Sequence, residues 1–409
     1  MSFRFVTAGE SHGPGLTAIV EGIPAGLELR PEDIDADLAR RQLGHGRGGR
    51  MKIEKDRAQV TAGVRHGRTL GSPVSMWIEN RDYQNWEERM NPWPVDGEVE
   101  EVHLPRPGHA DLAGIQKFGH TDVRNVLERA SARETAARVA AGALAKAFLR
   151  PLGVEIRSHV TRIGTVTAPT PNPLAAGSDP SALPHASGTV PARGLSPPDF
   201  EGVDDSPVRS LDADASQAMV AEIDAARKAN ESLGGEFQVI AFGLVPGIGS
   251  HTSWEERLDG RLAQAIMSIQ ALKGVAIGDG FALAERVGSQ AHDEIFWSNE
   301  RGYSRETNRA GGLEGGMTTG DPLVVTGAMK PLPTLTKPLR SVDTETKEPA
   351  QALRERTDSC TVPAAGVVGE AMVALVLAAA YREKFGGDHM DDVLAALRAY
   401  EERIGWRRA

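Results

Sequence analysis

The sequence predicts an α+β protein, and two observations carry this prediction. Short runs with alternating apolar residues, such as Val74, Met76 and Ile78, gather near the N-terminus and are typical of strands. Helix-like runs with start signals and apolar stripes lie between and after these strands. The length of 409 residues allows one large or two closely joined domains, and we take 1–409 as a single domain.

The first half of the chain supplies most of the predicted strands. Strands are expected at 3–7, 16–20, 59–64 and 74–78, and helices at 31–42 and from Ser131 to Pro151. Pro31 suits the first turn of a helix, and Arg41 suits the negative end of its dipole. Ser131 and Glu134 form a capping-box pattern before an alanine-rich helix, which predicts close packing against a neighbour.

The second half begins with a change of composition. Proline, serine, glycine and alanine predominate at 167–207, so we expect an irregular excursion outside the core. This excursion covers a site, lies at a subunit interface or is disordered; the sequence leaves all three open. Further helices are expected at 212–230, from Ser253 to 272, at 363–384 and from Asp391, with strands at 237–244 and 323–328.

Two short segments are similar to each other. The residues GIPAGL at 22–27 and GLVPGI at 243–248 each follow a predicted strand and precede a predicted helix. A match this short is explained by chance as well as by internal duplication, so both explanations stay open.

Positive charge is concentrated in one segment of an acidic chain. The formal net charge is −10, yet the segment RRQLGHGRGGR at 40–50 carries four arginines among glycines. Arginine binds phosphate or carboxylate oxygens two at a time, and glycine lets the backbone approach a ligand. The segment is therefore a candidate anion-binding loop, with a solvated loop as the alternative. The acidic balance argues against nucleic-acid binding.

Composition also bears on the compartment. The N-terminal residues lack the apolar run of a secretory signal, and the single cysteine, Cys360, fits a reducing environment. The strongly apolar stretch at 371–380 is shorter than the ~20 residues that a membrane span requires. We therefore expect a buried helix there, no membrane association and a cytoplasmic protein.

Several common motifs are excluded. Gly44, Gly46 and Gly49 match the pattern G-x-G-x-x-G, but they follow a predicted helix rather than a strand, so we reject a dinucleotide site. The sequence contains no Walker A lysine motif, no H-E-x-x-H and no paired C-x-x-C. Neither nucleotide hydrolysis nor a metal site is expected.

Two histidines lie in glycine-containing turns beside polar residues. His12 belongs to AGESHGPG and His109 to PRPGHADLAG. Histidine titrates near neutrality, so each is a candidate proton donor or acceptor. The alternative for each is a loop histidine that only binds nearby backbone groups.

Arginines and glycines mark three further segments. Arg124, Arg129 and Arg133 surround Ser131, where a helix N-terminus would attract an anion, unless these arginines are simply exposed. The segment NRAGGLEGGMTTGDP, followed by MKPLPT, suits a backbone that lines a flat or polar ligand. An arginine at 356 and an aspartate at 358 belong to the site or form a surface pair.

In this order, the segments resemble the chorismate synthase family. The matching segments are AGESHGPG, RRQLGHGRGGRMKIE, RPGHADLAG, RNVLERASARETAARVA, GSHTSWEERLDGRLAQAIMSIQALKGV, NRAGGLEGGMTTGDP, MKPLPT and ERTDSCTVPAAG. The poorer matches are the excursion and His45, where the family more often has tyrosine. The resemblance implies a β-α-β sandwich, with helices packed between antiparallel sheets, and a homotetramer.

The resemblance also implies a reaction. Chorismate synthases remove phosphate and a ring hydrogen from 5-enolpyruvylshikimate 3-phosphate in an anti-1,4 sense, which gives chorismate for aromatic amino acid biosynthesis. They require reduced FMN although nothing is oxidised overall. A substrate with two carboxylates and a phosphate agrees with clustered arginines in an acidic chain.

Roles for individual residues follow from the family motifs. His12 should protonate or stabilise the leaving phosphate, His109 should face flavin N1, and Asp358 should assist proton removal near flavin N5. The FMN contacts should be Arg129, Ala130, Ser131, Gln270, Ala271, Gly315, Lys330, Pro331, Leu332, Pro333, Thr334 and Arg356. Arg41 and Arg47 should contact NADPH or the anions of the substrate, and we favour the substrate. Further candidates for substrate anions are Arg50, Arg106, Arg124 and Arg133.

Other interpretations stay open at this point. One is a flavin-binding protein without catalytic competence, and another is a nucleic-acid binder that uses its arginine-glycine loop. NADPH is a candidate reductant for the flavin. Because the sequence shows no additional reductase domain, we expect a separate reductase to supply reduced flavin.

Overall fold

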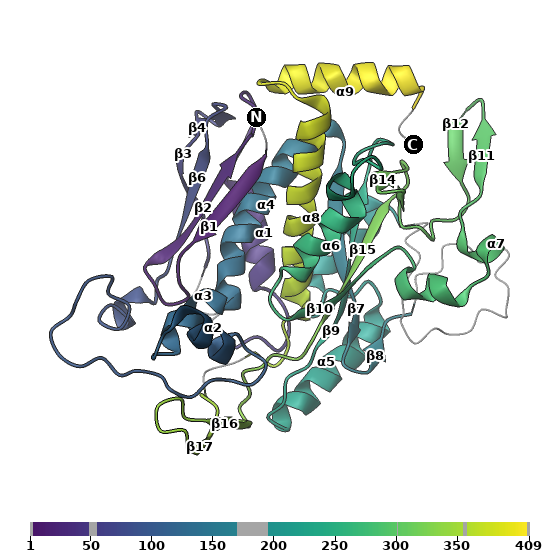
Figure 1. Cartoon of the computed structure of the whole chain (residues 1–409). Coiled ribbons are helices and arrows are strands. Elements are labelled where there is room, and N and C mark those ends of the chain that lie inside the picture. Colours follow the sequence, from purple (N-terminus) through teal and green to yellow (C-terminus); the bar gives the residue numbers. More distant parts are fainter. Residues whose placement is uncertain (1–2, 49–54, 170–194, 301, 355–357, 407–409) are drawn as a thin grey trace.

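Two antiparallel sheets enclose a layer of helices in the computed structural model, which describes residues 3–48, 55–169, 195–300, 302–354 and 358–406 (Figure 1). The first sheet has the strand order β1 (Arg4–Ala8), β2 (Gly15–Glu21), β6 (Val74–Glu79), β3 (Gln59–Ala62). The second has the order β10 (Leu272–Ile277), β15 (Leu323–Met329), β9 (Gly235–Phe242), β7 (Glu155–Ile163), β8 (Val166–Thr167). The predicted α+β sandwich is confirmed.

Four helices form the middle layer: α1 (Pro31–Gln42), α4 (Thr135–Leu149), α6 (Leu258–Met267) and α8 (Val362–Phe385). Helix α4 packs against the first sheet, and α8 packs against the second. The two helices approach each other through small residues, because a Cβ on Gly142 would lie 2.3 Å from the Cβ of Ala371. Any larger residue at 142 would push the two halves apart.

The remaining elements lie around this sandwich. The outer helices are α2 (Asp111–Phe118), α3 (Arg124–Ala130), α5 (Ala213–Lys228), α7 (Gly288–Ala291) and α9 (Met390–Ile404). Small hairpins pair β4 (Val64–Arg65) with β5 (Arg68–Thr69), β11 (Ile295–Ser298) with β12 (Gly302–Arg305), β13 (Leu313–Glu314) with β14 (Met317–Thr318), and β16 (Arg340–Val342) with β17 (Pro349–Gln351). Short 3-10 turns are η2 (Tyr83–Asn85), η3 (Ala132–Glu134), η4 (Arg150–Leu152), η5 (Pro197–Phe200), η6 (Val203–Asp205), η7 (Trp254–Glu256) and η8 (Gly280–Glu285).

The two halves of the chain repeat one topology. The elements β1, β2, α1, β3, β6 and α4 correspond in chain order to β7, β9, α6, β10, β15 and α8. The sheet order β1-β2-β6-β3 likewise corresponds to β7-β9-β15-β10. Each half therefore contributes one sheet and two helices to the sandwich.

The two similar six-residue segments lie at equivalent places in these halves. The hydroxyl of Thr69 accepts a hydrogen bond from the backbone N–H of Leu27 at 3.0 Å and donates to a carbonyl three residues earlier at 2.6 Å. Thr318 makes the same two bonds, with the N–H of Ile248 at 2.9 Å and with the carbonyl three residues before it at 2.6 Å. Shared bonds in a shared topology favour internal duplication over chance.

Helix α8 is longer than the sequence analysis predicts. It has 24 residues and is apolar enough, by length and composition alone, to cross a membrane. However, 94% of its most apolar window is buried inside the protein. Burial between α4 and the second sheet, rather than insufficient length, is what marks α8 as a core helix.

Three predicted helix boundaries are wrong. Ser253 precedes the short turn η7, and α6 begins only at Leu258. Helix α6 ends at Met267, and Leu272, which was expected on its inner face, begins strand β10. Ser131 caps the short turn η3 rather than α4, and the Glu134 carboxylate binds Arg138 at 2.9 Å instead of turning back to the cap. The carboxylate is drawn forward because a charged partner lies one helical turn ahead.

Part of the proline-rich excursion belongs to the core, against expectation. The turns η5 and η6 place Phe200 and Val203 in a small apolar cluster with Phe242 of β9. The following Arg209 is 1% exposed and reaches the core helix α8, where it lies 3.3 Å from Glu370. The predicted excursion residues 170–194 lie outside the described residues.

Protonation of His159 is expected to destabilise the fold as the pH falls. His159 on β7 is 2% exposed, and burial lowers its pKa from 6.5 to about 4. Between these values the unfolded chain binds a proton that the folded protein does not, so stability present above pH 6.5 is lost towards pH 4. Between pH 8 and pH 5, we expect the free energy of unfolding to fall by about 2 kcal/mol more in the wild type than in His159→Gln, measured by urea unfolding. Equal losses in the two proteins would contradict this.

Candidate active site

Most of the predicted site residues meet at one end of the sandwich. This end is where α4 begins and β15 ends, and Figure 1 shows α2 and α3 beside it. Backbone and side-chain bonds join the turn after β1, the loop after α1, helices α2 and α3, and the segments that follow α6 and β15. Residues far apart in the sequence therefore share one neighbourhood.

His12 lies in the turn between β1 and β2 and binds a buried glutamate. Its Nδ1 lies 2.9 Å from Glu128 Oε1 on α3, and its backbone N–H donates to Glu128 Oε2 at 2.9 Å. From the other side, the Asn80 side chain donates to the Gly13 carbonyl at 2.8 Å and holds the turn. The His12 side chain is 13% exposed, so the ring is fixed but can be reached from solvent.

Glu128 stays ionised although it is buried. Burial by itself would raise the pKa of this carboxyl, but hydrogen bonds from His12 and the charge of Arg124 outweigh it and lower the pKa. An ionised carboxylate beside Nδ1 makes this nitrogen a donor, so that Nε2 is the nitrogen that exchanges a proton with a ligand.

His109 belongs to a charge cluster with Arg106 and Asp111. Its Nδ1 contacts Asp111 Oδ1, and Arg106 binds the same carboxylate through Nε at 2.9 Å and Nη2 at 3.2 Å. Burial opposes ionisation of Asp111, but bonds from His109 and Arg106 hold its pKa far below the usual range. Arg106 also donates to Thr334 Oγ1 at 3.1 Å. The cluster thus fixes the His109 ring and links it to the segment after β15.

Arg41 and Arg133 form a second, buried cluster around Asp56. Arg133 Nη1 donates to Asp56 Oδ1 at 2.7 Å, and Arg41 Nη1 lies 3.5 Å from Oδ2. Arg41 also donates to Thr135 Oγ1 at 2.9 Å and to the Ala132 carbonyl at 3.0 Å. The side chains of both arginines are at most 6% exposed. Their guanidinium groups therefore hold the N-terminus of α4 in place.

Asp358 binds the arginine-glycine loop. Its Oδ1 accepts a hydrogen bond from Gly48 N–H at 2.5 Å, and its Oδ2 lies 3.4 Å from Arg47 Nε. A backbone bond from Ser359 N–H to the Gly46 carbonyl, at 2.8 Å, continues the contact. The loop after α1 and the start of α8 are thereby joined.

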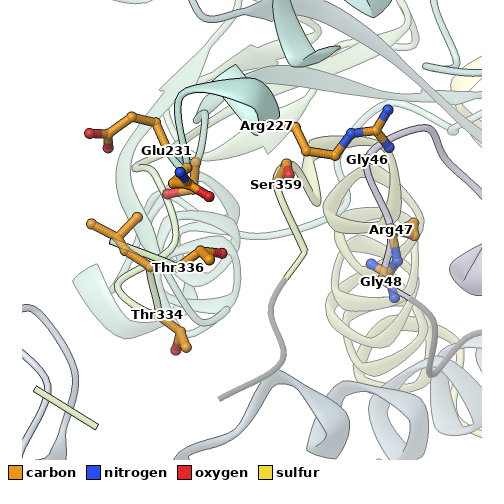
Figure 2. A pocket seen from close by; sticks show the side chains of 11 residues that line it. Gly46, Arg47, Gly48, Arg227, Glu231, Thr334, Thr336 and Ser359 are labelled. Atoms are coloured by element: carbon orange, nitrogen blue, oxygen red, sulfur yellow. The ribbon is translucent and has the colours of Figure 1, made fainter. Parts of the chain in front are cut away.

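A small polar pocket adjoins this loop (Figure 2). Arg47 and its flanking glycines lie on one side, Arg227 comes from the last turn of α5, and Glu231 comes from the segment after this helix. The rest of the wall comes from the segment after Lys330, through Thr334 and Thr336, and from Ser359. Two arginines among hydroxyl groups suit an anionic or polar ligand.

The segments predicted to contact FMN lie beside these groups. Gln270 Oε1 is buried and has no hydrogen-bond partner within the described part of the chain. The Ala271 carbonyl accepts a bond from Lys330 N–H at 3.0 Å, and Lys330 Nζ donates to the Gly108 carbonyl at 2.5 Å. Burial and the charge of Lys273 lower the pKa of Lys330. An anion bound here would offset that repulsion.

Helix α3 supplies three further predicted contacts. Arg129 donates to two carbonyls at the end of β1, at 2.9 and 3.1 Å. Ala130 is the last residue of α3, and Ser131 Oγ lies 3.2 Å from Ser11 Oγ beside His12. The predicted segment after β15 consists of Lys330, Pro331, Leu332, Pro333 and Thr334, and Ser232 donates to the Leu332 carbonyl at 2.8 Å.

Gly315 lies away from the other predicted contacts. It belongs to the turn between β13 and β14, a hairpin that follows Gly311, whose carbonyl binds Val324 N–H near the start of β15, whereas Lys330 follows Met329 at the end of that strand. A strand of this length spans about 20 Å. One copy of the chain therefore does not bring Gly315 to the other residues. Two further predicted residues, Arg50 and Arg356, lie outside the described residues.

Comparison with known proteins decides the family. The family model described as chorismate synthase matches residues 3–381. The chain belongs to the chorismate synthase family. The chorismate synthase of Rubrobacter xylanophilus is 55% identical over 407 residues, which cover 99% of this chain and 98% of that protein. The chorismate synthase of Symbiobacterium thermophilum is 54% identical, and the match covers 99% of this chain and 100% of that protein. A solved structure titled "Crystal Structure of Chorismate Synthase" is 42% identical, has a TM-score of 0.76 and covers 99% of this chain and 98% of its own.

Membership of the chorismate synthase family gives the reaction. The chain is a lyase of the shikimate pathway that eliminates phosphate from 5-enolpyruvylshikimate 3-phosphate to give chorismate for aromatic amino acid biosynthesis. The family uses reduced FMN. The family resemblance and the fold that it implied are thereby confirmed.

Sequence reasoning missed three acidic partners. Glu128, Asp111 and Asp56 hold His12, His109 and the buried arginine pair respectively. Asp111 lies two residues after His109, a spacing that could have marked it. Asp56 and Glu128 carry no such signal, because their partners are distant in sequence.

Proposed function

We propose that chorismate is formed at this end of the sandwich, with His12 as the acid that protonates the departing phosphate. The bond between His12 and the buried, ionised Glu128 supports this role most directly, because it orients the imidazole and makes Nε2 the nitrogen that exchanges a proton with a ligand. Protonation and charge neutralisation make phosphate a better leaving group. Asp358, held against the arginine-glycine loop, would assist removal of the ring proton.

The residues present fit reduced FMN. Gln270 offers a buried acceptor that a ligand N–H can satisfy, and Lys330 with Lys273 offers positive charge for an anionic group. We propose that 129–131, 270–271 and 330–334 hold the cofactor, with His109 turned towards its ring. Reduced FMN, when bound, supplies an electron transiently and recovers it. The protein's part is to bind, orient and tune it.

The arginines divide into two groups by burial. Arg41, Arg106 and Arg133 bind protein carboxylates in buried clusters, which suits a role in fixing the site. Arg47 lines the pocket of Figure 2, and we propose that it contacts an anionic group of the substrate, with NADPH as the alternative ligand. The Arg124 side chain is 12% exposed beside Glu128 and is proposed to face the substrate phosphate.

We further propose a cytoplasmic homotetramer that receives reduced flavin from a separate reductase. Large apolar side chains on the β11–β12 hairpin support association, since Ile295, Trp297 and Tyr303 are 63%, 61% and 77% exposed. Association would also allow Gly315 to reach the site of a neighbouring copy. Light scattering during size-exclusion chromatography measures the number of chains.

The reaction is tested by phosphate release. Purified protein is mixed anaerobically with 5-enolpyruvylshikimate 3-phosphate and with reduced FMN, oxidised FMN or no flavin. Phosphate and chorismate are expected in equal amounts, and only with reduced FMN. Unchanged release without flavin would overturn the proposed mechanism. Replacing reduced FMN by FMN and NADPH then tests whether the chain reduces its own flavin.

A further inference from the structure

We propose that Trp86 is a positioning residue for His12, an inference that depends on the proposed acid role of His12. The two rings are stacked, with centroids 3.8 Å apart and an interplanar angle of 26°. Glu128 meets the edge of the imidazole at Nδ1, while the indole covers a face of the ring. Two contacts in different directions leave the imidazole little freedom to rotate, and direct Nε2 towards a ligand.

Trp86 is itself held by groups that also hold the His12 turn. Its Nε1 donates to Asp82 Oδ2 at 3.2 Å, and Asp82 N–H donates to Asn80 Oδ1 at 3.1 Å. The Asn80 amide, in turn, donates to the Gly13 carbonyl at 2.8 Å. Asn80 therefore links the turn that carries the acid to the turn that carries the indole. The stack is part of a connected network rather than a chance contact of an exposed loop.

Two arginines also lie against the indole. The Cζ atoms of Arg124 and Arg89 lie 5.2 and 5.8 Å from its centroid. The face of an indole attracts a cation, so these contacts help to hold Trp86 over the imidazole.

The test compares Trp86→Leu, Trp86→Phe and Trp93→Leu. We expect Trp86→Leu to lower kcat about ten- to a hundredfold with little change in KM, because a misplaced acid slows the chemical step but not binding. Trp86→Phe should restore much of the loss, since it keeps an aromatic face. Trp93, in the same loop but 76% exposed, serves as the matched control and should leave kcat unchanged. A Trp86→Leu protein that folds normally and keeps the kcat of the wild type would overturn the proposal.

A second measurement needs neither flavin nor substrate. A protonated imidazole in contact with an indole quenches its fluorescence, so emission of the wild type should fall as His12 gains its proton. The step should be absent in Trp86→Phe and in His12→Asn, and present in Trp93→Leu. If the step is the same in all four proteins, the stack does not exist in solution and the proposal fails. If the step behaves as expected but His12→Asn retains full turnover, it is the acid role of His12, and with it the proposed function of Trp86, that fails.

Discussion

Replacing Glu370 by alanine is expected to destabilise the protein by about 3–5 kcal/mol. Glu370 is a fully buried residue of α8 at the middle of the sandwich. Its carboxylate binds Arg40 at 2.8 Å, Lys146 at 2.5 Å, Arg209 at 3.3 Å and the Ser158 hydroxyl at 2.6 Å. Removing it leaves three cations close together with only Asp37 and Asp204 as carboxylate partners, and the 1% exposed Arg209 cannot regain its hydration without unfolding.

Urea unfolding at neutral pH measures this loss. The matched control is Glu383→Ala, which removes a carboxylate from the same helix where it is 55% exposed and pairs with Arg261. The control substitution should lower the free energy of unfolding by no more than about 1 kcal/mol, because an exposed ion pair contributes little to stability. Equal changes in the two variants would show that the buried cluster is not a central support of the fold.

Local signals in the sequence predicted the helices better than the second sheet. The helix predicted at 31–42 agrees with α1 at both ends, because Pro31 begins it and its charges match the dipole. Strand β7 was missed because its middle residues, Ser158, His159 and Thr161, are polar although they are buried. Their partners include Arg209 and other groups that lie far along the chain, so alternation of apolar residues could not reveal the strand.

In the site, too, the features that depend on neighbouring residues were predicted, and those that depend on distant residues were not. Glycine-containing turns marked His12 and His109, and the structure gives both an acidic partner. The partners were not found, since Glu128 joins His12 only after α3 folds against the turn. Sequence reasoning also treated Arg41 and Arg133 as ligands for anions, but could not know that Asp56 would be buried between them. Charge counts identify an electropositive site, whereas desolvation decides which charges remain available.

Replacing His109 by alanine is expected to lower kcat for phosphate release by about 10²–10⁴-fold, the usual contribution of a well-placed acid–base group. The protein should still fold, because Asp111 keeps its bonds to Arg106 at 2.9 and 3.2 Å after the imidazole is removed. It should also still bind FMN, since the proposed contacts at Gln270 and Lys330 are untouched.

Two measurements separate catalysis from binding in this variant. Turnover is followed by phosphate release with reduced FMN, and flavin binding by the change in flavin fluorescence on titration with protein. His120→Ala is the control, because this histidine is exposed just beyond the end of α2. If His109→Ala binds flavin and loses turnover while His120→Ala loses neither, His109 acts in the chemistry. If His109→Ala turns over at the wild-type rate, the Arg106–Asp111 cluster serves only to anchor the segment after β15.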